Sequence, residues 1–401
     1  MSRPQLQLRA SCAACSKPHP VVVADPPLPP LALTSVDKLA PKLPIEGESQ
    51  IFLWNSGSEA NEAAVKIVRR ATGRNNIIVM QGSYHGRTYG ASALTKSKTI
   101  YSQNVGSVMP GVIMTPFPTW HTLGVSVDTP EAELVRLASY QLELVLKQQS
   151  APTDTAAIFI EPILGEGGYI PAPAAYLRFL RKVCDEHGIL LVVDEVQSGY
   201  GRSGHFWAID ALPEVKPDLI IFAKGLANGF PLSGVATTKA IMQTMKPGSL
   251  GGTYAGNAVA CAAAGAVLDV FAEDDILANV RARSAQAFEA LHALASSPKT
   301  GHLIADVRGQ GLMIGVEFHD PTDAICSLSA KAQAAEASGK STPANIPTRV
   351  QNKCFEKGLM VLTTSIYPVI RFIPALIVTE AEMAQAMDIF KQALEEVALE
   401  G

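Results

Sequence analysis

Short apolar runs alternate with longer helical patterns between about residues 50 and 300, and this rhythm restricts the fold more than any other feature of the sequence. Most of the runs are apolar at nearly every position, which is typical of parallel strands covered on both faces. The rhythm therefore predicts an α/β domain with a mainly parallel sheet. The expected strands are 51–54, 76–80, 156–160, 189–193 and 218–223, and the expected helices include 58–71, 174–187 and 257–271.

The pattern changes after about residue 300. Residues 307–318 (VRGQGLMIGVEF) are expected to form a strand interrupted by glycines, and residues 369–372 a second strand. Residues 327–347 predict a surface helix with a loop, and residues 380–397 have strong helical spacing. We therefore expect an irregular proline-rich arm (1–45), a large α/β domain (46–300) and a small α+β domain (301–401).

Nine of the 27 prolines lie in the first 44 residues. Such a segment favours extended or polyproline geometry and makes a poor helix. Arg3, Arg9 and Lys17 precede the first acidic residue, Asp25, so a targeting segment is one interpretation. An unstructured arm is the other. We therefore expect a cytoplasmic protein, with a mitochondrial location as the alternative.

The overall composition excludes several classes of protein. The chain is 47% hydrophobic and 17% charged, which rules out a wholly disordered or fibrous protein. A formal net charge of −4 gives no basic footprint for nucleic acid, and no window reaches the ~18 apolar residues of a membrane helix. The six cysteines are sparse and irregular, as in a reducing compartment. We expect no nucleic acid or membrane partner and assign no metal site.

Two charged residues follow consecutive expected strands. Asp194 comes directly after 189–193, and Lys224 ends the next apolar run, DLIIFAK. Ligands of open α/β sheets bind outside the carboxyl ends of the strands, so Asp194 either caps a loop or faces a charged ligand. A lysine removed from water has a lowered pKa and can form a Schiff base with a carbonyl. A surface lysine at a strand end is the alternative.

The segment FLWNSGSEANE predicts a strand that breaks into a helix. Ser56 and Glu59 fit a capping box, in which side chains satisfy the free backbone N–H groups of the helix start. The same helix start is also an anion site, because free N–H groups and the positive end of the helix dipole meet beside Gly57. A well-capped helix and a phosphate cradle both remain open.

Together these features are the parts that a pyridoxal 5′-phosphate enzyme requires. The phosphate needs a helix amino terminus, the aldehyde needs a lysine, and the pyridine nitrogen needs a carboxylate that keeps it protonated. The motif GSYHGRT adds Tyr84 and His85, which can face the cofactor ring. We therefore predict pyridoxal 5′-phosphate as the cofactor.

Seven separated motifs then place the chain in a family. They are NSGSEANE, SYHGRT, IEPILGEGG, VVDEVQSGYGRSG, PDLIIFAKGLANGFPL, GGTYAGN and VIRFIPAL. Over about residues 45–398 the sequence resembles the class III aminotransferases of the fold-type I pyridoxal phosphate enzymes, and it is most similar to the 4-aminobutyrate and acetylornithine type. The resemblance implies a large, mainly parallel-sheet domain with a smaller α+β domain, in a homodimer with shared active sites.

The resemblance also implies roles for individual residues at the cofactor. Lys224 corresponds to the lysine that forms the Schiff base and moves a proton between the substrate α-carbon and cofactor C4′. Asp194 corresponds to the partner of the pyridinium nitrogen. The other implied contacts are Gly57 and Ser58 at the phosphate, Tyr84 and His85 at the ring, Gln197 at the 3′-oxygen, and Thr253 at the phosphate of the neighbouring subunit.

For the substrate, the resemblance implies three residues. Arg87 corresponds to the arginine that binds the distal carboxylate of an ω-amino acid or the α-carboxylate of acetylornithine. Arg371 corresponds to the arginine that binds the carboxylate of 2-oxoglutarate or glutamate bidentately. Glu166 corresponds to the acid that pairs with this arginine while the ω-amino substrate is bound. Glu161 matches a family position, but we assign it no role.

The resemblance implies a ping-pong aminotransferase that moves an amino group from an ω-amino acid, such as 4-aminobutyrate, to a 2-oxo acid. The alternatives are an acetylornithine or alanine–glyoxylate type aminotransferase, a decarboxylating transaminase, an aminomutase, or a cofactor-binding protein of weak activity. The last is motivated by the amino-terminal region, where only Pro18-His19-Pro20-Val21 faintly matches the family. We expect this region to be shortened or replaced by the proline-rich arm.

Overall fold

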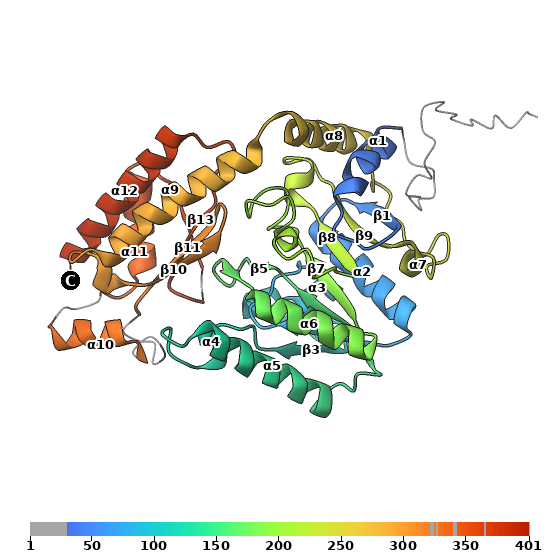
Figure 1. The fold of residues 1–401 in the computed structure, drawn as a ribbon, viewed down its shortest axis with the longest axis horizontal. Helices are drawn as coiled ribbons and strands as arrows, with labels where there is room; N and C mark the ends of the chain where they lie inside the picture. The colour runs from blue at the N-terminus through green and yellow to red at the C-terminus, as the bar shows by residue number, and fades with distance from the viewer. Residues whose placement is uncertain (1–29, 321–324, 326–327, 340–342, 365, 401) are drawn as a thin grey trace, which may run out of the picture.

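The computed structural model describes residues 30–320, 325, 328–339, 343–364 and 366–400. They form two main β-sheets, each covered by helices (Figure 1). The large sheet has seven strands, which confirms the predicted α/β class. In spatial order they are β1 (Ser49–Trp54), β9 (Ser233–Thr238), β8 (Leu219–Phe222), β7 (Leu190–Asp194), β4 (Thr155–Ile160), β2 (Asn76–Met80) and β3 (Val112–Thr115).

Parallel pairing dominates the large sheet, as predicted. β8, β7, β4, β2 and β3 pair in parallel, whereas β9 runs antiparallel to both β8 and β1. β9 was not predicted, because its residues SGVATT are small and partly polar although they are buried. The five predicted strands are confirmed, with ends that differ by at most two residues from those expected.

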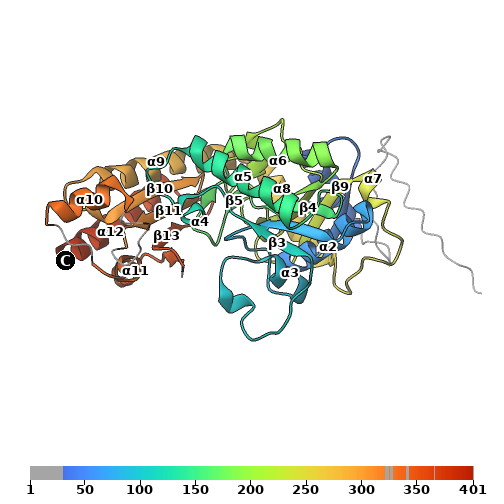
Figure 2. The ribbon, with the colours of Figure 1, turned by 90° about the horizontal axis from the view of Figure 1, so that it is seen from below.

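Helices cover both faces of the large sheet. Ile51 and Leu53 of β1 join the core that includes α5, α6 and α8, whereas Phe52 and Trp54 join the core that includes α2. Figure 2 shows α5 and α6 on one side of the strands and α2 on the other. This double coverage explains why the strands are apolar throughout. The helices are α2 (Gly57–Thr72), α5 (Glu131–Gln148), α6 (Ala174–His187) and α8 (Ala258–Glu273).

The smaller sheet is antiparallel, with strands β10 (Ile304–Gln310), β11 (Met313–Phe318), β13 (Val369–Phe372) and β12 (Leu362–Thr363) in that order. The expectation of one interrupted strand over 307–318 is wrong, because the chain reverses between β10 and β11. Gly311 allows this turn, with a φ of 60° and no room for a Cβ against the backbone of residues 202–204.

Three long helices pack against the smaller sheet, namely α9 (Ile276–Ser296), α11 (Ile346–Glu356) and α12 (Glu380–Leu399). α9 precedes residue 300, yet its buried residues belong to the hydrophobic core of the smaller sheet. The domain limit at residue 300 therefore stays a prediction. The surface helix expected within 327–347 is α10 (Ala330–Ala337). Shorter elements are α3 (Tyr89–Leu94), α4 (Trp120–Leu123), α7 (Lys239–Met242), β5 (Ile163–Leu164) and β6 (Ile170–Pro171). Across the described residues, no helix is both long and apolar enough to span a membrane.

The expectation of an irregular arm is wrong for residues 30–42. They form α1 (Pro30–Leu39) and a 3₁₀ turn, Ala40–Lys42. Proline suits the first position of a helix, where its missing N–H is not needed. Val36 and Leu39 are buried, and Lys38 forms an ion pair of 2.6 Å with Asp269 of α8. The proposed targeting segment and Pro18-His19-Pro20-Val21 lie outside the described residues.

The carboxyl ends of β1, β2, β4, β7 and β8 meet at one edge of the large sheet, because β1 points the same way as the parallel strands. Asp194 is the last residue of β7 and lies opposite Ile221 of β8. Lys224 therefore follows within three residues at the same edge. This is where ligands of open α/β sheets bind.

Candidate active site

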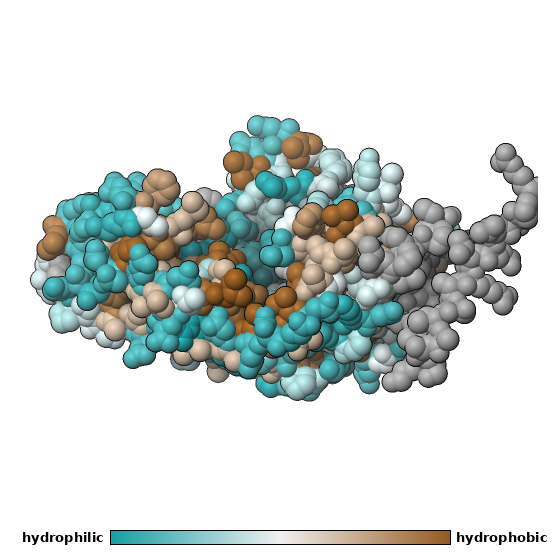
Figure 3. All heavy atoms as spheres, turned by 90° about the horizontal axis from the view of Figure 1, so that it is seen from above, coloured by the Kyte–Doolittle hydropathy of each residue, from teal (hydrophilic) through white to brown (hydrophobic). Residues whose placement is uncertain are grey.

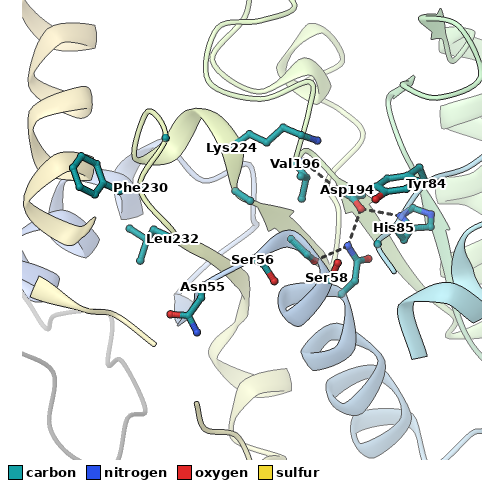
Figure 4. A pocket seen from close by; sticks show the side chains of 15 residues that line it. Asn55, Ser56, Ser58, Tyr84, His85, Asp194, Val196, Lys224, Phe230 and Leu232 are labelled. Carbon is teal, nitrogen blue, oxygen red and sulfur yellow. Dashed lines mark hydrogen bonds and ion pairs between the residues drawn. The ribbon is translucent and has the colours of Figure 1, made fainter. Parts of the chain in front are cut away.

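A cleft of about 300 Å³ opens at this edge (Figure 4). It is lined by the segments that follow β1, β2, β7 and β8. Six of the predicted cofactor-binding residues lie together in it, namely Gly57, Ser58, Tyr84, His85, Asp194 and Lys224. On the space-filling surface, apolar side chains border a hollow between the two parts of the molecule (Figure 3).

Asp194 is held as a buried anion by donors from three segments. Its Oδ2 lies 2.8 Å from Nδ1 of His85 and 3.0 Å from Nδ2 of Asn61, and its Oδ1 accepts the N–H of Val196 at 3.0 Å. Burial alone would raise the pKa of Asp194, but these donors and the charge of His85 outweigh burial and lower this pKa. The same contact outweighs burial at His85 and raises the pKa of the imidazole. The carboxylate can therefore keep its charge at neutral pH.

Lys224 begins a short 3₁₀ turn, Lys224–Leu226, directly after β8. Its φ of 27° is rare for a residue with a side chain, and such strain is typical of functional sites. The side chain is exposed to the cleft and extends toward the side where Asp194 and Tyr84 lie (Figure 4). The cleft walls partly remove the amine from water and lower the pKa of Lys224, although nearby acidic groups act in the opposite direction. A larger fraction of the amine is then unprotonated and nucleophilic.

The start of α2 supplies the anion-binding wall. Ser56 and Glu59 form the predicted capping box, with Ser56 Oγ accepting the N–H of Glu59 at 3.3 Å. The N–H groups of Gly57 and Ser58 have no acceptor within the helix, because they belong to its first turn. Gly57 packs tightly, and a Cβ there would stand 3.1 Å from a methyl group of Val196. The free N–H groups of this helix start make it a suitable site for a phosphate.

Tyr84 and the loop after β4 are tied together by Glu161. This buried carboxylate accepts the N–H of Tyr84 at 2.8 Å and that of Gly165 at 3.0 Å. Burial raises the pKa of Glu161 to about 7, and Asp194 adds to this effect while His85 and the two N–H donors oppose it. The half-buried ring of Tyr84 packs edge-to-face on Tyr101 at 5.3 Å. Glu161 thus fixes the ring wall of the cleft to the loop that carries Glu166.

Glu166, in the turn between β5 and β6, forms an ion pair with Arg371 of the smaller sheet. Nη1 of Arg371, on β13, donates to Oε1 of Glu166 at 2.8 Å and to the carbonyl oxygen of Gly165 at 3.2 Å. Burial would raise the pKa of Glu166, but Arg371 and Lys98 outweigh it and lower this pKa. Nε of Arg371 is buried and has no hydrogen-bond partner among the described residues. The guanidinium therefore keeps donor capacity for a carboxylate.

The remaining predicted residues lie outside the cleft lining or at its border. Arg87 is exposed, its N–H donates to Ser58 Oγ at 3.3 Å, and its guanidinium lies 5.9 Å from the centre of the Tyr101 ring. Gln197 is partly buried beside Gly165. A Cβ added at Gly165 would stand 2.7 Å from Nε2 of Gln197. Thr253 lies in an exposed turn and does not line the cleft of its own chain.

Two polar residues of this region were not predicted. Asn61 lies one helical turn after Gly57 and joins α2 to Asp194, a position that the helical period could have indicated. Lys98 forms a 3.0 Å ion pair with Glu166, but its surroundings in sequence carry no motif. Only the folded loop brings Lys98 to Glu166.

These residues fit pyridoxal 5′-phosphate by the chemistry of their groups. The helix start suits the dianionic phosphate, the buried Asp194 suits a protonated pyridine nitrogen, and Lys224 offers an amine to the aldehyde. The buried Oδ1 of Asn61 and Nε2 of His85, which have no hydrogen-bond partner in the part of the chain described, add free polar atoms beside Asp194.

Comparisons with known proteins agree with this chemistry. Residues 28–394 match the family model described as aminotransferase class-III. The chain is 38% identical to the 5-aminovalerate aminotransferase DavT of Pseudomonas aeruginosa over 363 residues, which cover 90% of this chain and 79% of DavT. It is 37% identical to the 4-aminobutyrate aminotransferase GabT of Escherichia coli over 357 residues, covering 88% and 77% of the two chains.

The fold is also similar to that of solved aminotransferases. A structure of an aminotransferase from Vibrio fluvialis in its PMP-bound form superposes with a TM-score of 0.80 at 26% identity. The superposition covers 93% of this chain and 80% of the other.

Proposed function

Since the chain belongs to the class-III aminotransferases, which use pyridoxal 5′-phosphate, we propose that it moves the amino group of an ω-amino acid to a 2-oxo acid such as 2-oxoglutarate in a ping-pong cycle. The observation that carries this proposal is the ion pair between Glu166 and Arg371 beside the cleft. A site that accepts both an ω-amino acid and glutamate needs an arginine whose charge can be either neutralised or offered to a carboxylate.

Five residues that line the cleft, with Gln197 at its border, would hold the phosphate, the ring and the aldehyde carbon of the cofactor. Gly57 and Ser58 would bind its phosphate, Tyr84 and His85 would face its ring, and Lys224 would attach it covalently. Gln197 would contact its 3′-oxygen. When bound, the cofactor supplies an electron-withdrawing ring that accepts the electron pair of the substrate C–H bond.

The chain's own groups would then manage charge and protons. Asp194 would keep the pyridine nitrogen protonated, and His85 and Asn61 would hold its carboxylate in place. Lys224 would take a proton from the carbon that bears the amino group and return one to the cofactor, a role that its lowered pKa supports.

Substrate recognition would depend on where each carboxylate binds. Arg87 would bind the distal carboxylate of the ω-amino acid, while Glu166 neutralises Arg371. A 2-oxo acid would instead use Arg371 for its carboxylate once Glu166 moves aside. The two relatives compared above are named for 4-aminobutyrate and 5-aminovalerate, both ω-amino acids, and this supports a donor of that class.

A second copy of the chain would complete the site. Thr253 would bind the phosphate of the neighbouring subunit, in a homodimer with shared active sites. The exposed apolar residues around it support this proposal, because Tyr254 is 76% exposed and Val259 is 64% exposed. Large apolar side chains at a surface are typical of interfaces.

An amino-donor panel tests the proposed function. The purified holoenzyme would be mixed with 4-aminobutyrate, 5-aminovalerate, acetylornithine, β-alanine or glutamate in single half-reactions. Loss of the visible absorption of the bound aldehyde cofactor would report transfer. We expect rapid transfer from an ω-amino acid and from glutamate. Release of carbon dioxide, isomerisation without an oxo acid, or binding without conversion would each contradict the proposal.

Lys224→Ala is the matched negative variant for this panel. Removal of the amine takes away both the covalent attachment and the proton carrier, so we expect a loss of at least roughly 10²–10⁴-fold in every half-reaction. Full transamination by Lys224→Ala would overturn the role proposed for this residue.

A further inference from the structure

Glu166 has two cationic partners, one on each oxygen. Oε1 accepts from Nη1 of Arg371 at 2.8 Å, and Oε2 accepts from Nζ of Lys98 at 3.0 Å. The hydroxyl of Tyr101 lies 3.5 Å from the same Oε2. The carboxylate therefore bridges a strand of the small sheet and the loop between α3 and β3 of the large part.

The three charged side chains are largely removed from water. Exposed fractions are 14% for the side chain of Lys98, 18% for that of Glu166 and 8% for that of Arg371. Ion pairs at this depth are less screened than surface pairs, and a carboxylate left there without a partner is costly. The position of Glu166 therefore depends on which cation it keeps.

End-on binding of a substrate carboxylate, through both Nη atoms of Arg371, requires that Glu166 give up Nη1. In the structure this nitrogen serves Glu166 and the carbonyl oxygen of Gly165, while the buried Nε has no partner within the described residues. If Arg371 were the only cation beside Glu166, its release would leave an unpaired anion next to an anionic substrate. Lys98 removes this penalty, because it already holds the other oxygen.

We propose that Lys98 is a positioning residue that retains Glu166 when Arg371 exchanges it for the carboxylate of glutamate or a 2-oxo acid. The inference rests on the proposed function, in which Arg371 binds that carboxylate. Lys98 then determines the balance between the two substrate classes. When Lys98 is present, it can hold Glu166 after the ion pair with Arg371 breaks, so that Arg371 is free to bind a carboxylate. Without Lys98, Glu166 remains paired with Arg371, and the site favours the ω-amino acid.

The test compares glutamate with the ω-amino donor on the same holoenzyme. Lys98→Met should raise the KM for glutamate about tenfold, the effect of one charged hydrogen bond. The KM for 4-aminobutyrate or 5-aminovalerate should change less than about threefold. Lys98→Arg should restore most of the loss. Lys96→Met is the matched control, since Lys96 lies on the same loop and makes no ion pair with Glu166.

A double variant separates action through Glu166 from direct contact with the substrate. In a Glu166→Gln background, Lys98→Met should have no further effect on the KM for glutamate. An effect that persists there would mean that Lys98 binds the substrate itself and would overturn the inference. Equal changes for both substrates, or no change for either, would overturn it too. If Lys98→Met does not fold, Lys98→Gln replaces it.

The wild-type reactions keep this test distinct from that of the proposed function. If wild-type holoenzyme transfers no amino group from any ω-amino acid, the proposed function fails. If the wild-type holoenzyme does transfer the amino group of an ω-amino acid, but the Lys98 variants show no selective effect on the KM for glutamate, only the role of Lys98 fails.

Discussion

The two sides of the cleft are built differently. On the cofactor side, Asp194 accepts hydrogen bonds from His85, Asn61 and Val196, all within the large part of the molecule. On the substrate side, Glu166 lies in the turn between β5 and β6 and Arg371 lies on β13 of the smaller sheet, and the pair still has an unused donor. One carboxylate is fully enclosed by its own donors, whereas the other is shared between two cations.

This difference matches what each side would have to do in a ping-pong cycle. The cofactor stays bound through both half-reactions, so a rigid, fully paired anion can serve it throughout. In the proposed cycle the amino donor and the oxo acid would occupy the other side in turn, so a carboxylate that can change partners would be needed there. The comparison predicts different responses to substitution on the two sides.

The largest effect on stability is expected at Arg308, which anchors the substrate side. Its Nε donates to the carbonyl oxygen of Gly168 at 3.1 Å, and its Nη1 pairs with Asp306 and with the buried Glu317. Arg308→Met would leave the buried Glu317 with His121 as its other partner among the described residues, so we expect a loss of up to about 3–5 kcal/mol in the free energy of unfolding. Urea unfolding of the holoenzyme would measure it.

The exposed pair of Arg178 and Glu214 gives a control for this prediction. Arg178→Met should cost at most about 1 kcal/mol, because exposed ion pairs contribute little. Equal losses of unfolding free energy in Arg308→Met and Arg178→Met would contradict this prediction. They would show that the buried contacts of Arg308 do not hold the loop at 165–168 on the small sheet. Below the unfolding transition, the Arg308 variant should still bind cofactor.

The second effect concerns catalysis on the cofactor side. Asp194→Asn removes the charge proposed to face the pyridine nitrogen, so we expect both half-reactions to slow by roughly 10²–10³-fold, the usual cost of a lost electrostatic contact. The pKa of His85 should fall, since Asp194 is what raises it. Stopped-flow half-reactions and NMR titration of His85 would measure the two changes.

Asp218→Asn is the matched control. Asp218 accepts the N–H of Leu191 at 2.7 Å and pairs with Arg181 at the opposite edge of the same sheet. Its replacement should reduce stability and leave both half-reactions within about twofold. If Asp194→Asn slowed the half-reaction of only one of the two substrates, the contrast between the two sides of the cleft would be wrong. A residue that acts on the cofactor should slow both half-reactions.

Much of this architecture could be predicted from the sequence, because fully covered parallel strands are apolar throughout. The strand Asn76–Met80 and the helix Ala174–His187 match the prediction at both ends. β9 was not predicted, because its small and partly polar residues resemble those of a loop. α1 was not predicted, because the neighbouring prolines indicated an irregular segment. Strand ends that meet at one edge explain why residues such as Lys224 and Asp194 could be predicted to share a site.

Contacts between distant segments could not be predicted in the same way. Asn61 reaches Asp194 across 133 positions of sequence, and Lys98 reaches Glu166 across 68. The helical period indicates only that Asn61 lies on the same side of α2 as Gly57, and nothing in the sequence near Lys98 indicates its partner. Both contacts depend on how the segments that follow the strands fold over the sheet edge. The role proposed for Thr253 depends on a second chain and stays a prediction.

The smallest effect compares two helix starts with the same cap. Ser56 at α2 and Thr379 at α12 both form capping boxes, but only Ser56 lines the cleft. Ser56→Ala and Thr379→Ala should each cost about 1 kcal/mol in the free energy of unfolding. Only Ser56→Ala should also weaken cofactor binding, by about two- to fivefold, because the cap orients the N–H groups that we propose to bind the phosphate. Equal cofactor affinity in the two variants, measured by dialysis and absorbance, would show that the start of α2 does not hold the phosphate.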